Sequence, residues 1–186
     1  MDSNVAELLS GAAIQEPDKT VLSEAVTGRI ITFSGLDELV QRVVQGFSDA
    51  GMIAGYRVMI ATGNSIEFVA AYLGALRAGM VAVPVNPRSA TGELIRMIAD
   101  SGTRMVIADA GTIDAVRDAV GGLGEAMEAA GYEAAAKPRI VAVGTTVENY
   151  DFIGYGTAAA LHQSDTPTAD GFVRHGPSGR RIAYGE

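Results

Sequence analysis

The chain has 186 residues, of which 48% are hydrophobic and 19% charged, and its formal net charge is −8. This length is typical of one domain, and the ratio of hydrophobic to charged residues allows a real hydrophobic core and excludes a disordered chain. The acidic balance excludes a partner bound through its nucleic-acid backbone, and the absence of cysteine excludes disulfides, thiol nucleophiles and thiolate metal sites. No basic leader and no apolar run of about 18 residues occurs, which predicts a cytoplasmic, soluble protein without a membrane span.

Two helices and a hairpin are expected first along the chain. An amphipathic helix is expected over Asn4–Gln15, with Asn4 as the N-cap and Pro17 stopping it. Its apolar face is expected to consist of Val5, Leu8, Leu9, Ala12 and Ala13. Two β-prone runs on either side of Thr27-Gly28 predict a small hairpin. Ser34 is then expected to cap a long amphipathic helix that ends at Gly51.

Short apolar runs alternate with helical stretches from residue 57 onward, and this alternation predicts parallel strands joined by crossover helices. The fold class is therefore expected to be α/β, with a parallel Rossmann-like sheet flanked by helices. The expected strands are Val58–Ala61, Met80–Val85, Met105–Ala108 and Ile140–Val143, and the expected helices are Ser65–Ala78, Thr91–Ser101 and Ile113–Val120.

The glycine-rich stretch that follows is harder to interpret. Gly121–Lys137 is expected to be a surface excursion, with a short helix over Leu123–Ala130 as the one element that it could add. Gly121-Gly122-Leu123-Gly124 is interpreted as a turn, because it lacks the spacing and the preceding strand of a dinucleotide loop. The composition becomes polar after Asp165, which predicts an α/β domain over residues 1–165 and a loose tail over residues 166–186.

The remaining polar motifs are better explained by structure than by chemistry. Ala61-Thr62-Gly63-Asn64-Ser65 joins a strand to a helix and would suit either an anion site or a tight turn with Asn64 or Ser65 as the helix cap. His162 and His175 have no ligand set around them, and no nucleophile elbow occurs. The acidic residues along 114–128 are interpreted as a solvated face.

Three segments resemble the first half of adenylate-forming acyl-CoA synthetases. The most distinctive runs from Gly55 to Phe68 and continues through Leu73-Gly74-Ala75-Leu76-Arg77-Ala78-Gly79 to Val83-Pro84-Val85-Asn86-Pro87. The other two are Ile31–Leu36 and Glu93–Gly102. The resemblance covers about Asn4–Asp109 and implies the N-terminal subdomain of that fold. These best-matched residues are expected to be structural, so no catalytic residue is proposed from them.

The family's phosphate-binding loop, "T-S-G-T-T-G-x-P-K-G", is expected near Val173–Ala183. Aligned on Gly176 and Gly179, the sequence keeps a hydroxyl at Ser178 but has Ile182 in place of the lysine. Gly176, Ser178 and Gly179 are therefore candidate cofactor-binding residues of a degenerate loop. A weak anion site and a basic tail without a ligand remain alternatives for this segment.

The resemblance implies the N-terminal fragment of an ATP-dependent acyl-CoA synthetase for a carboxylic or fatty acid, catalytically incomplete by itself. ATP and Mg²⁺ are the implied cofactors, and tight binding of either by this chain is not expected. Self-association or a separately encoded remainder of the ligase are the expected partners. The alternative functions are a non-catalytic interaction module that docks on such a partner and a minimal Rossmann-like nucleotide binder.

Overall fold

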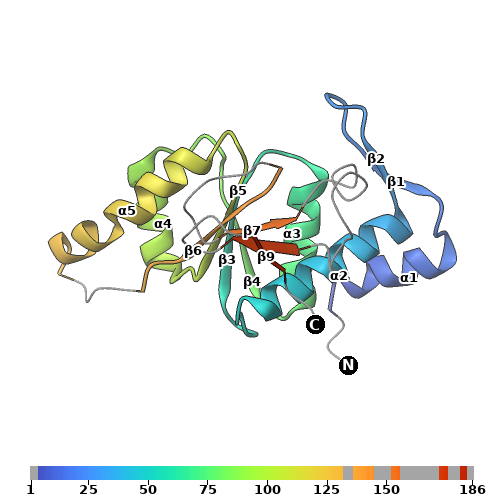
Figure 1. The fold of residues 1–186 in the computed structure, drawn as a ribbon, viewed down its shortest axis with the longest axis horizontal. Helices are drawn as coiled ribbons and strands as arrows, with labels where there is room; N and C mark the ends of the chain where they lie inside the picture. Colours follow the sequence, from blue (N-terminus) through green and yellow to red (C-terminus); the bar gives the residue numbers. More distant parts are fainter. Residues whose placement is uncertain (1–3, 132–135, 145–151, 156–171, 176–180, 184–186) are drawn as a thin grey trace.

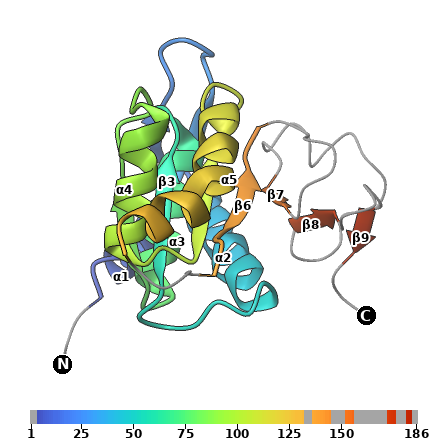
Figure 2. The same cartoon turned by 90° about the vertical axis from the view of Figure 1, so that its left-hand side faces the viewer.

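The computed structural model describes residues 4–131, 136–144, 152–155, 172–175 and 181–183. Its centre is a four-stranded parallel sheet of β3 (Arg57–Ala61), β4 (Val81–Pro84), β5 (Met105–Ala108) and β6 (Arg139–Ala142), in the order β4-β3-β5-β6. Helices cover both faces, so the α/β fold expected from the sequence is confirmed (Figures 1 and 2). The four strands lie within one residue of the expected ones.

Side chains point alternately to the two faces of the sheet, and this divides the core into two halves. Val58 and Ile60 point toward α2 (Phe33–Asp49) and α3 (Ile66–Arg77), whereas Met59 and Ala61 point toward α4 (Thr91–Ser101) and α5 (Ile113–Ala129). Successive side chains of a strand face opposite sides of a sheet, so a strand buried on both sides must be apolar throughout. This explains the continuous apolar runs of the sequence.

Pro84 lies in the edge strand β4, at a position that tolerates proline. The N–H groups of Val81 and Val85 donate to the carbonyls of Tyr56 and Ile60, at 2.9 and 3.1 Å. By alternation, the nitrogen of Pro84 faces away from β3, toward the open edge of the sheet. The proline therefore costs no ladder hydrogen bond and removes a donor that another strand could use.

The N-terminal elements differ in detail from the prediction. Helix α1 spans Glu7–Gln15, because Asn4 instead forms a turn in which its side chain accepts from the N–H of Ala6 at 3.0 Å. Leu8, expected on the buried face of this helix, is 74% exposed, while Ala6 and Leu9 are buried. The apolar spacing identified the helix but assigned part of its buried face wrongly.

The predicted hairpin is confirmed as antiparallel β1 (Thr20–Ser23) and β2 (Ile30–Thr32). The predicted cap of α2 was wrong, because Thr32 accepts from the N–H of Gly35 at 3.2 Å, while the hydroxyl of Ser34 donates to the carbonyl of Pro17 at 2.9 Å. Gly51, with φ of 71°, follows the last turn of α2 as expected.

The expected turn at Gly121-Gly122-Leu123-Gly124 was also wrong, since α5 continues through it to Ala129. The short helix expected over Leu123–Ala130 is present as the end of α5. Val116, Val120 and Leu123 form one buried stripe at helical spacing. The three helical glycines together cost about 3 kcal/mol relative to alanine, whereas burial contributes about 1.5 to 3 kcal/mol for each of the three residues of this stripe. Tertiary packing therefore outweighs the local preference of these glycines.

Three further strands were not predicted: β7 (Phe152–Tyr155), β8 (Phe172–His175) and β9 (Arg181–Ala183). They form an antiparallel sheet in the order β7-β8-β9, and β7 lies beside β6 (Figure 2). Two of them fall within residues 166–186, expected to be a loose tail. The proposed division of the chain at residue 165 stays a prediction.

Candidate functional site

The carboxyl ends of β3 and β5 form the natural place for a ligand in this sheet. The chain passes from β3 to β4 on one side and then to β5 on the other, so strand order reverses between β3 and β5. Open parallel sheets bind ligands in the crevice outside such a switch point. Here that position, called the crevice below, lies between residues 62–65 after β3 and residues 109–112 after β5.

Asp109 and Thr112 close this crevice with the chain's own groups. The carboxylate of Asp109 accepts from the N–H of Gly63 at 2.7 Å and from the N–H of Gly111 at 2.9 Å. The hydroxyl of Thr112 donates to the carbonyl of Ala61 at 2.5 Å. A carboxylate thus occupies the backbone donors that a phosphate would need, and its charge would repel a phosphate.

The N-terminus of α3, which begins beside the same crevice, is closed in a similar way. The hydroxyl of Ser65 accepts from the N–H of Phe68 at 3.1 Å, and the carboxylate of Glu24 accepts from the N–H of Ile66 at 2.8 Å. Negative groups are favoured at a helix N-terminus, and here the protein supplies one itself. Of the two alternatives for residues 61–65, this geometry supports the turn and cap rather than an anion site.

Arg29 links the hairpin to α3 through the same acidic groups. Its guanidinium donates to both carboxylate oxygens of buried Glu67, at 2.5 and 3.2 Å, and lies 3.5 Å from the carboxylate of Glu24. The hydrogen bond with Glu67 raises the pKa of Arg29, and the negative charges of Glu67 and Glu24 add to this increase. Desolvation by burial lowers the pKa but is outweighed. The geometry is that of a bidentate structural ion pair.

The pKa of Glu24 is lowered despite its surroundings. Desolvation by burial would raise this pKa, but the hydrogen bonds from Thr27 and from the N–H of Ile66, with the charge of Arg29, together outweigh it. Glu24 is therefore held in its charged form, as a cap and as a partner of Arg29.

Thr62 is the remaining polar residue of the crevice. It is 3% exposed, and its hydroxyl has no hydrogen-bond partner among the residues that the structure describes. This single hydroxyl does not offset the negative charge that Asp109, Glu24 and Glu67 place at the crevice. The described residues of the crevice do not fit a nucleotide phosphate, and no group of three potential metal ligands occurs in the described part of the chain.

The candidate residues Gly176, Ser178 and Gly179 lie outside the described residues. Their segment joins β8 to β9, which pair antiparallel with Arg174 opposite Ile182. The cofactor-binding role of these three residues stays a prediction. None of the described contacts brings the crevice and this segment together.

The motif residue Arg77 proves to be structural. Its guanidinium donates to the carboxylate of Asp37 at 2.6 Å, to the hydroxyl of Ser10 at 2.9 Å and to the carbonyl of Ala6 at 3.2 Å. One side chain at the end of α3 thus binds α1 and α2. This agrees with the expectation that the best-matched motif builds the fold and carries no chemistry.

Asp109 and Thr112 were not predicted as site residues from the sequence. An aspartate three residues before a threonine, directly after a buried strand, is typical of a side-chain-stabilised turn. That local signal predicts the contact between Asp109 and Thr112. The contact with Gly63, 46 residues away, depends on the strand order and has no local signal.

No helix among the described residues is long and apolar enough to cross a membrane.

Comparison with known proteins gives consistent results. A family model described as "AMP-binding enzyme" matches residues 9–169. The chain is 34% identical over 92 residues to 4-coumarate–CoA ligase 5 of Oryza sativa, covering 50% of this chain and 17% of that protein. It is 32% identical over 117 residues to the long-chain-fatty-acid–CoA ligase FadD13 of Mycobacterium tuberculosis, covering 61% of this chain and 23% of that protein.

A solved structure, the N-terminal domain of FACL13 from Mycobacterium tuberculosis, superimposes with a TM-score of 0.59 at 26% identity. The superposition covers 81% of this chain and 41% of the solved chain. The chain therefore has the N-terminal fold of these ligases, and it spans about a fifth of the length of the two curated relatives.

Proposed function

Because this chain belongs to the AMP-binding enzyme family, we propose that it forms the N-terminal part of an ATP-dependent acyl-CoA synthetase acting on a carboxylic or fatty acid. The family match over residues 9–169 carries this proposal. The ligase relatives support the reaction class, since both are named as CoA ligases.

We also propose that the chain is catalytically incomplete by itself. In the described part, the N–H groups of Gly63, Ile66 and Phe68 at the switch point are bound by Asp109, Glu24 and Ser65, and the two carboxylates would repel a phosphate. The chain also corresponds to 17% and 23% of the two ligases. ATP and Mg²⁺ would be bound by the assembled enzyme, with residues 1–165 as its first α/β layer and residues 166–186 as the tail that carries the degenerate loop. The protein would act in the cytoplasm, in fatty-acid or related carboxylic-acid metabolism.

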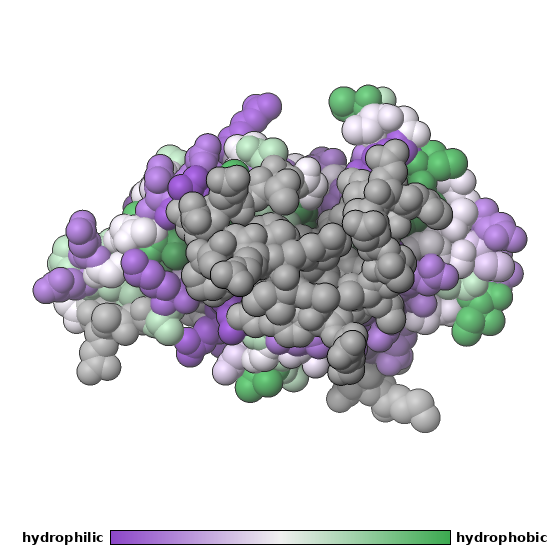
Figure 3. Space-filling view, viewed as in Figure 1, coloured by the Kyte–Doolittle hydropathy of each residue, from purple (hydrophilic) through white to green (hydrophobic). Residues whose placement is uncertain are grey.

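A second candidate, a non-catalytic interaction module, is favoured by exposed apolar side chains. Val26 at the hairpin tip is 99% exposed, and Leu8 and Ile14 of α1 are also exposed. Figure 3 shows hydrophobic residues at the hairpin tip and near α1, separated by hydrophilic ones. The partner would be a second copy of the chain or a separately encoded remainder of the ligase.

A chimera tests the first proposal. Residues 4–144 would replace the equivalent segment of the FadD13 ligase, and acyl-adenylate formation would be measured with a long-chain fatty acid. The proposal predicts measurable adenylate formation by a folded chimera. A chimera that melts cooperatively near the temperature of the parent enzyme but forms no adenylate would contradict it. Light scattering of the isolated chain tests the second candidate, which a clean monomer over a wide concentration range would argue against.

A further inference from the structure

Helix α3 has an outward side without a charged residue. Both charged residues of the helix, Glu67 and Arg77, are paired with residues of the hairpin and of α2. Successive residues of a helix are rotated by about 100°, which places the buried residues of α3 on one half of its circumference. The other half, called the α3 face below, has only aromatic and aliphatic side chains. These are Phe68, Val69, Tyr72, Leu73 and Leu76.

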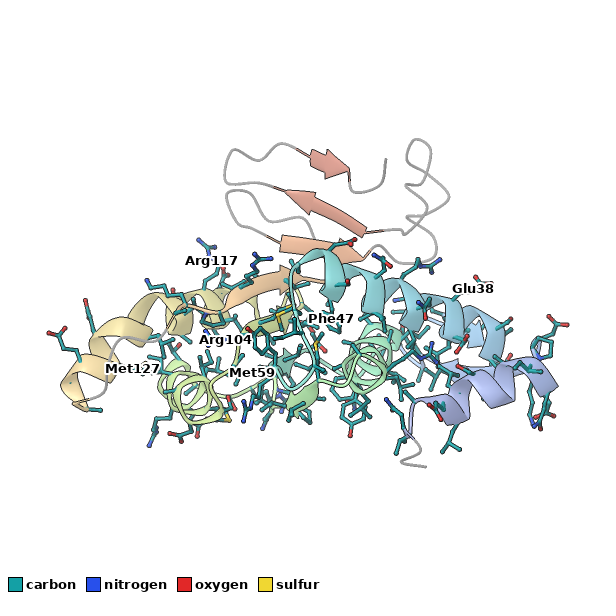
Figure 4. All side chains as sticks on the ribbon, turned by 90° about the horizontal axis from the view of Figure 1, so that it is seen from below. Glu38, Phe47, Met59, Arg104, Arg117 and Met127 are labelled. Carbon is teal, nitrogen blue, oxygen red and sulfur yellow. The ribbon has the colours of Figure 1, made fainter. Side chains whose placement is uncertain are left out.

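The α3 face is only partly covered. Tyr72 is 36% exposed, and its ring stacks on that of Phe68 with 6.3 Å between the ring centroids. The side chain of Asn4 donates to the carbonyl of Leu76 at 2.6 Å, and Val5, which follows Asn4, is 62% exposed. The apolar surface therefore continues from α3 toward the start of α1. Figure 4 shows α3 end-on, and no described helix or strand covers its side away from α2.

The outer sides of two other helices on the sheet are different. The exposed residues of α2 are Glu38, Gln41, Gln45 and Ser48, and those of α4 are Gly92, Glu93, Arg96 and Asp100. None of them is a large apolar residue. A helix with a polar outer side is suited to water, whereas a helix that is apolar all round is normally buried. The α3 face therefore indicates a surface that another polypeptide segment covers.

A second copy of the chain is a poor candidate for this cover. The α3 face runs along 12 residues, so it is roughly 18 Å long and about 10 Å wide. Stable complexes bury about 800 Å² on each partner, which is several times more. A second copy would also have to offset the loss of translational and rotational freedom on association, whereas a segment of the same domain would not.

The part of the ligase domain outside the matched region is the better candidate. This chain corresponds to 41% of the solved N-terminal domain of FACL13, so more than half of that domain lies outside the match. A domain is built around one core, and its layers cover the apolar sides of one another. A half-covered helix is therefore expected where the remaining layers of such a domain would pack.

We propose that the α3 face is the surface on which the remaining part of the ligase N-terminal domain docks. This inference rests on the proposed function, since it takes the chain as one part of such a ligase. The docking segment would present aliphatic and aromatic side chains, because a charged group would lose its hydration against the α3 face without gaining a partner.

Thiol labelling tests this proposal, because the chain has no cysteine of its own. Tyr72→Cys would be compared with the control Glu38→Cys, at an exposed position of α2 that Figure 4 labels. Each variant would be made in the full chain and in the chimera with FadD13, and mass spectrometry of tryptic peptides would follow modification by a maleimide. The thiol of Tyr72→Cys should react at least about tenfold more slowly in the chimera than in the isolated chain, and that of Glu38→Cys about equally in both.

The possible outcomes separate this proposal from the proposed function. Equal rates for Tyr72→Cys in the two proteins would overturn the docking surface, even if the chimera forms acyl adenylate. A protected thiol in a folded chimera that forms no adenylate would support the docking surface and contradict the proposed function. Protection that appears in the isolated chain as its concentration rises would identify a second copy as the occupant and overturn the proposal. If the chimera does not fold, a cysteine at the superimposed position of intact FadD13 replaces it, where protection supports the proposal and free reaction overturns it.

Discussion

Replacement of Gly74 by alanine should destabilise the protein, although alanine is the better helix former. Gly74 lies in α3 where that helix crosses α2, and a Cβ atom built there would lie 2.5 Å from Cγ1 and 2.9 Å from Cβ of Val43. Both distances are shorter than real Cβ contacts. Val43 is β-branched and buried, so it cannot rotate away cheaply.

The expected size follows from two opposing effects. Alanine gains about 1 kcal/mol in helix propensity over glycine. Overpacking of a closely packed core costs about 1 to 3 kcal/mol, and the upper part of that range applies because the clash involves the rigid start of a side chain. The free energy of unfolding of Gly74→Ala should therefore fall by about 1 to 2 kcal/mol.

Gly124→Ala is the control, because Gly124 also lies inside a helix but has nothing within 4 Å of its built Cβ atom. This variant should be more stable by up to about 1 kcal/mol. Urea unfolding followed by circular dichroism measures both values. If Gly74→Ala proves as stable as the wild type, the close approach of α2 and α3 is not as described here.

Three other predictions concern charges and the sheet edge. The pKa of Glu24 is lowered from its ordinary value of 4.5, so the stability that Glu24 contributes is fully present above that pH and is lost as the pH falls through the folded pKa. In Glu24→Gln, the free energy of unfolding should therefore fall less steeply as the pH is lowered below 4.5. Arg77→Ala should lower the free energy of unfolding by about 2 kcal/mol or more, because Asp37 loses its charged partner, while Arg96→Ala should change it by less than about 0.5 kcal/mol in urea unfolding. Pro84→Val should increase self-association in sedimentation velocity, since it restores an N–H at the open edge of β4. An unchanged sedimentation coefficient would contradict the conclusion that the nitrogen of residue 84 faces this open edge.

The sequence predicted the central sheet well because its signals are local. Each buried strand is a short apolar run bounded by turn residues, and Gly51, Gly79 and Gly102 mark helix ends at which the chain takes a positive φ. The errors arose where long-range packing decides. Leu123 draws a glycine-rich segment into α5, and Leu8 is exposed although its spacing matches that of buried residues.

The candidate site was less predictable for a related reason. Ser65 was one of two residues expected to cap α3, because a cap depends on a residue only three positions away. Glu24 and Asp109 reach the same region from 42 and 46 residues away, through pairings that the sequence does not reveal. The candidates Gly176, Ser178 and Gly179 depend on the family resemblance and lie outside the described residues.

The central claim is that this chain has the fold of a ligase's N-terminal part and lacks adenylating activity alone. Exchange of labelled pyrophosphate into ATP by the purified chain, in the presence of Mg²⁺ and 4-coumarate or a long-chain fatty acid, tests it most directly. The account predicts no exchange above a protein-free control, and none after Ile182→Lys. Exchange that depends on both the carboxylic acid and the chain would contradict it.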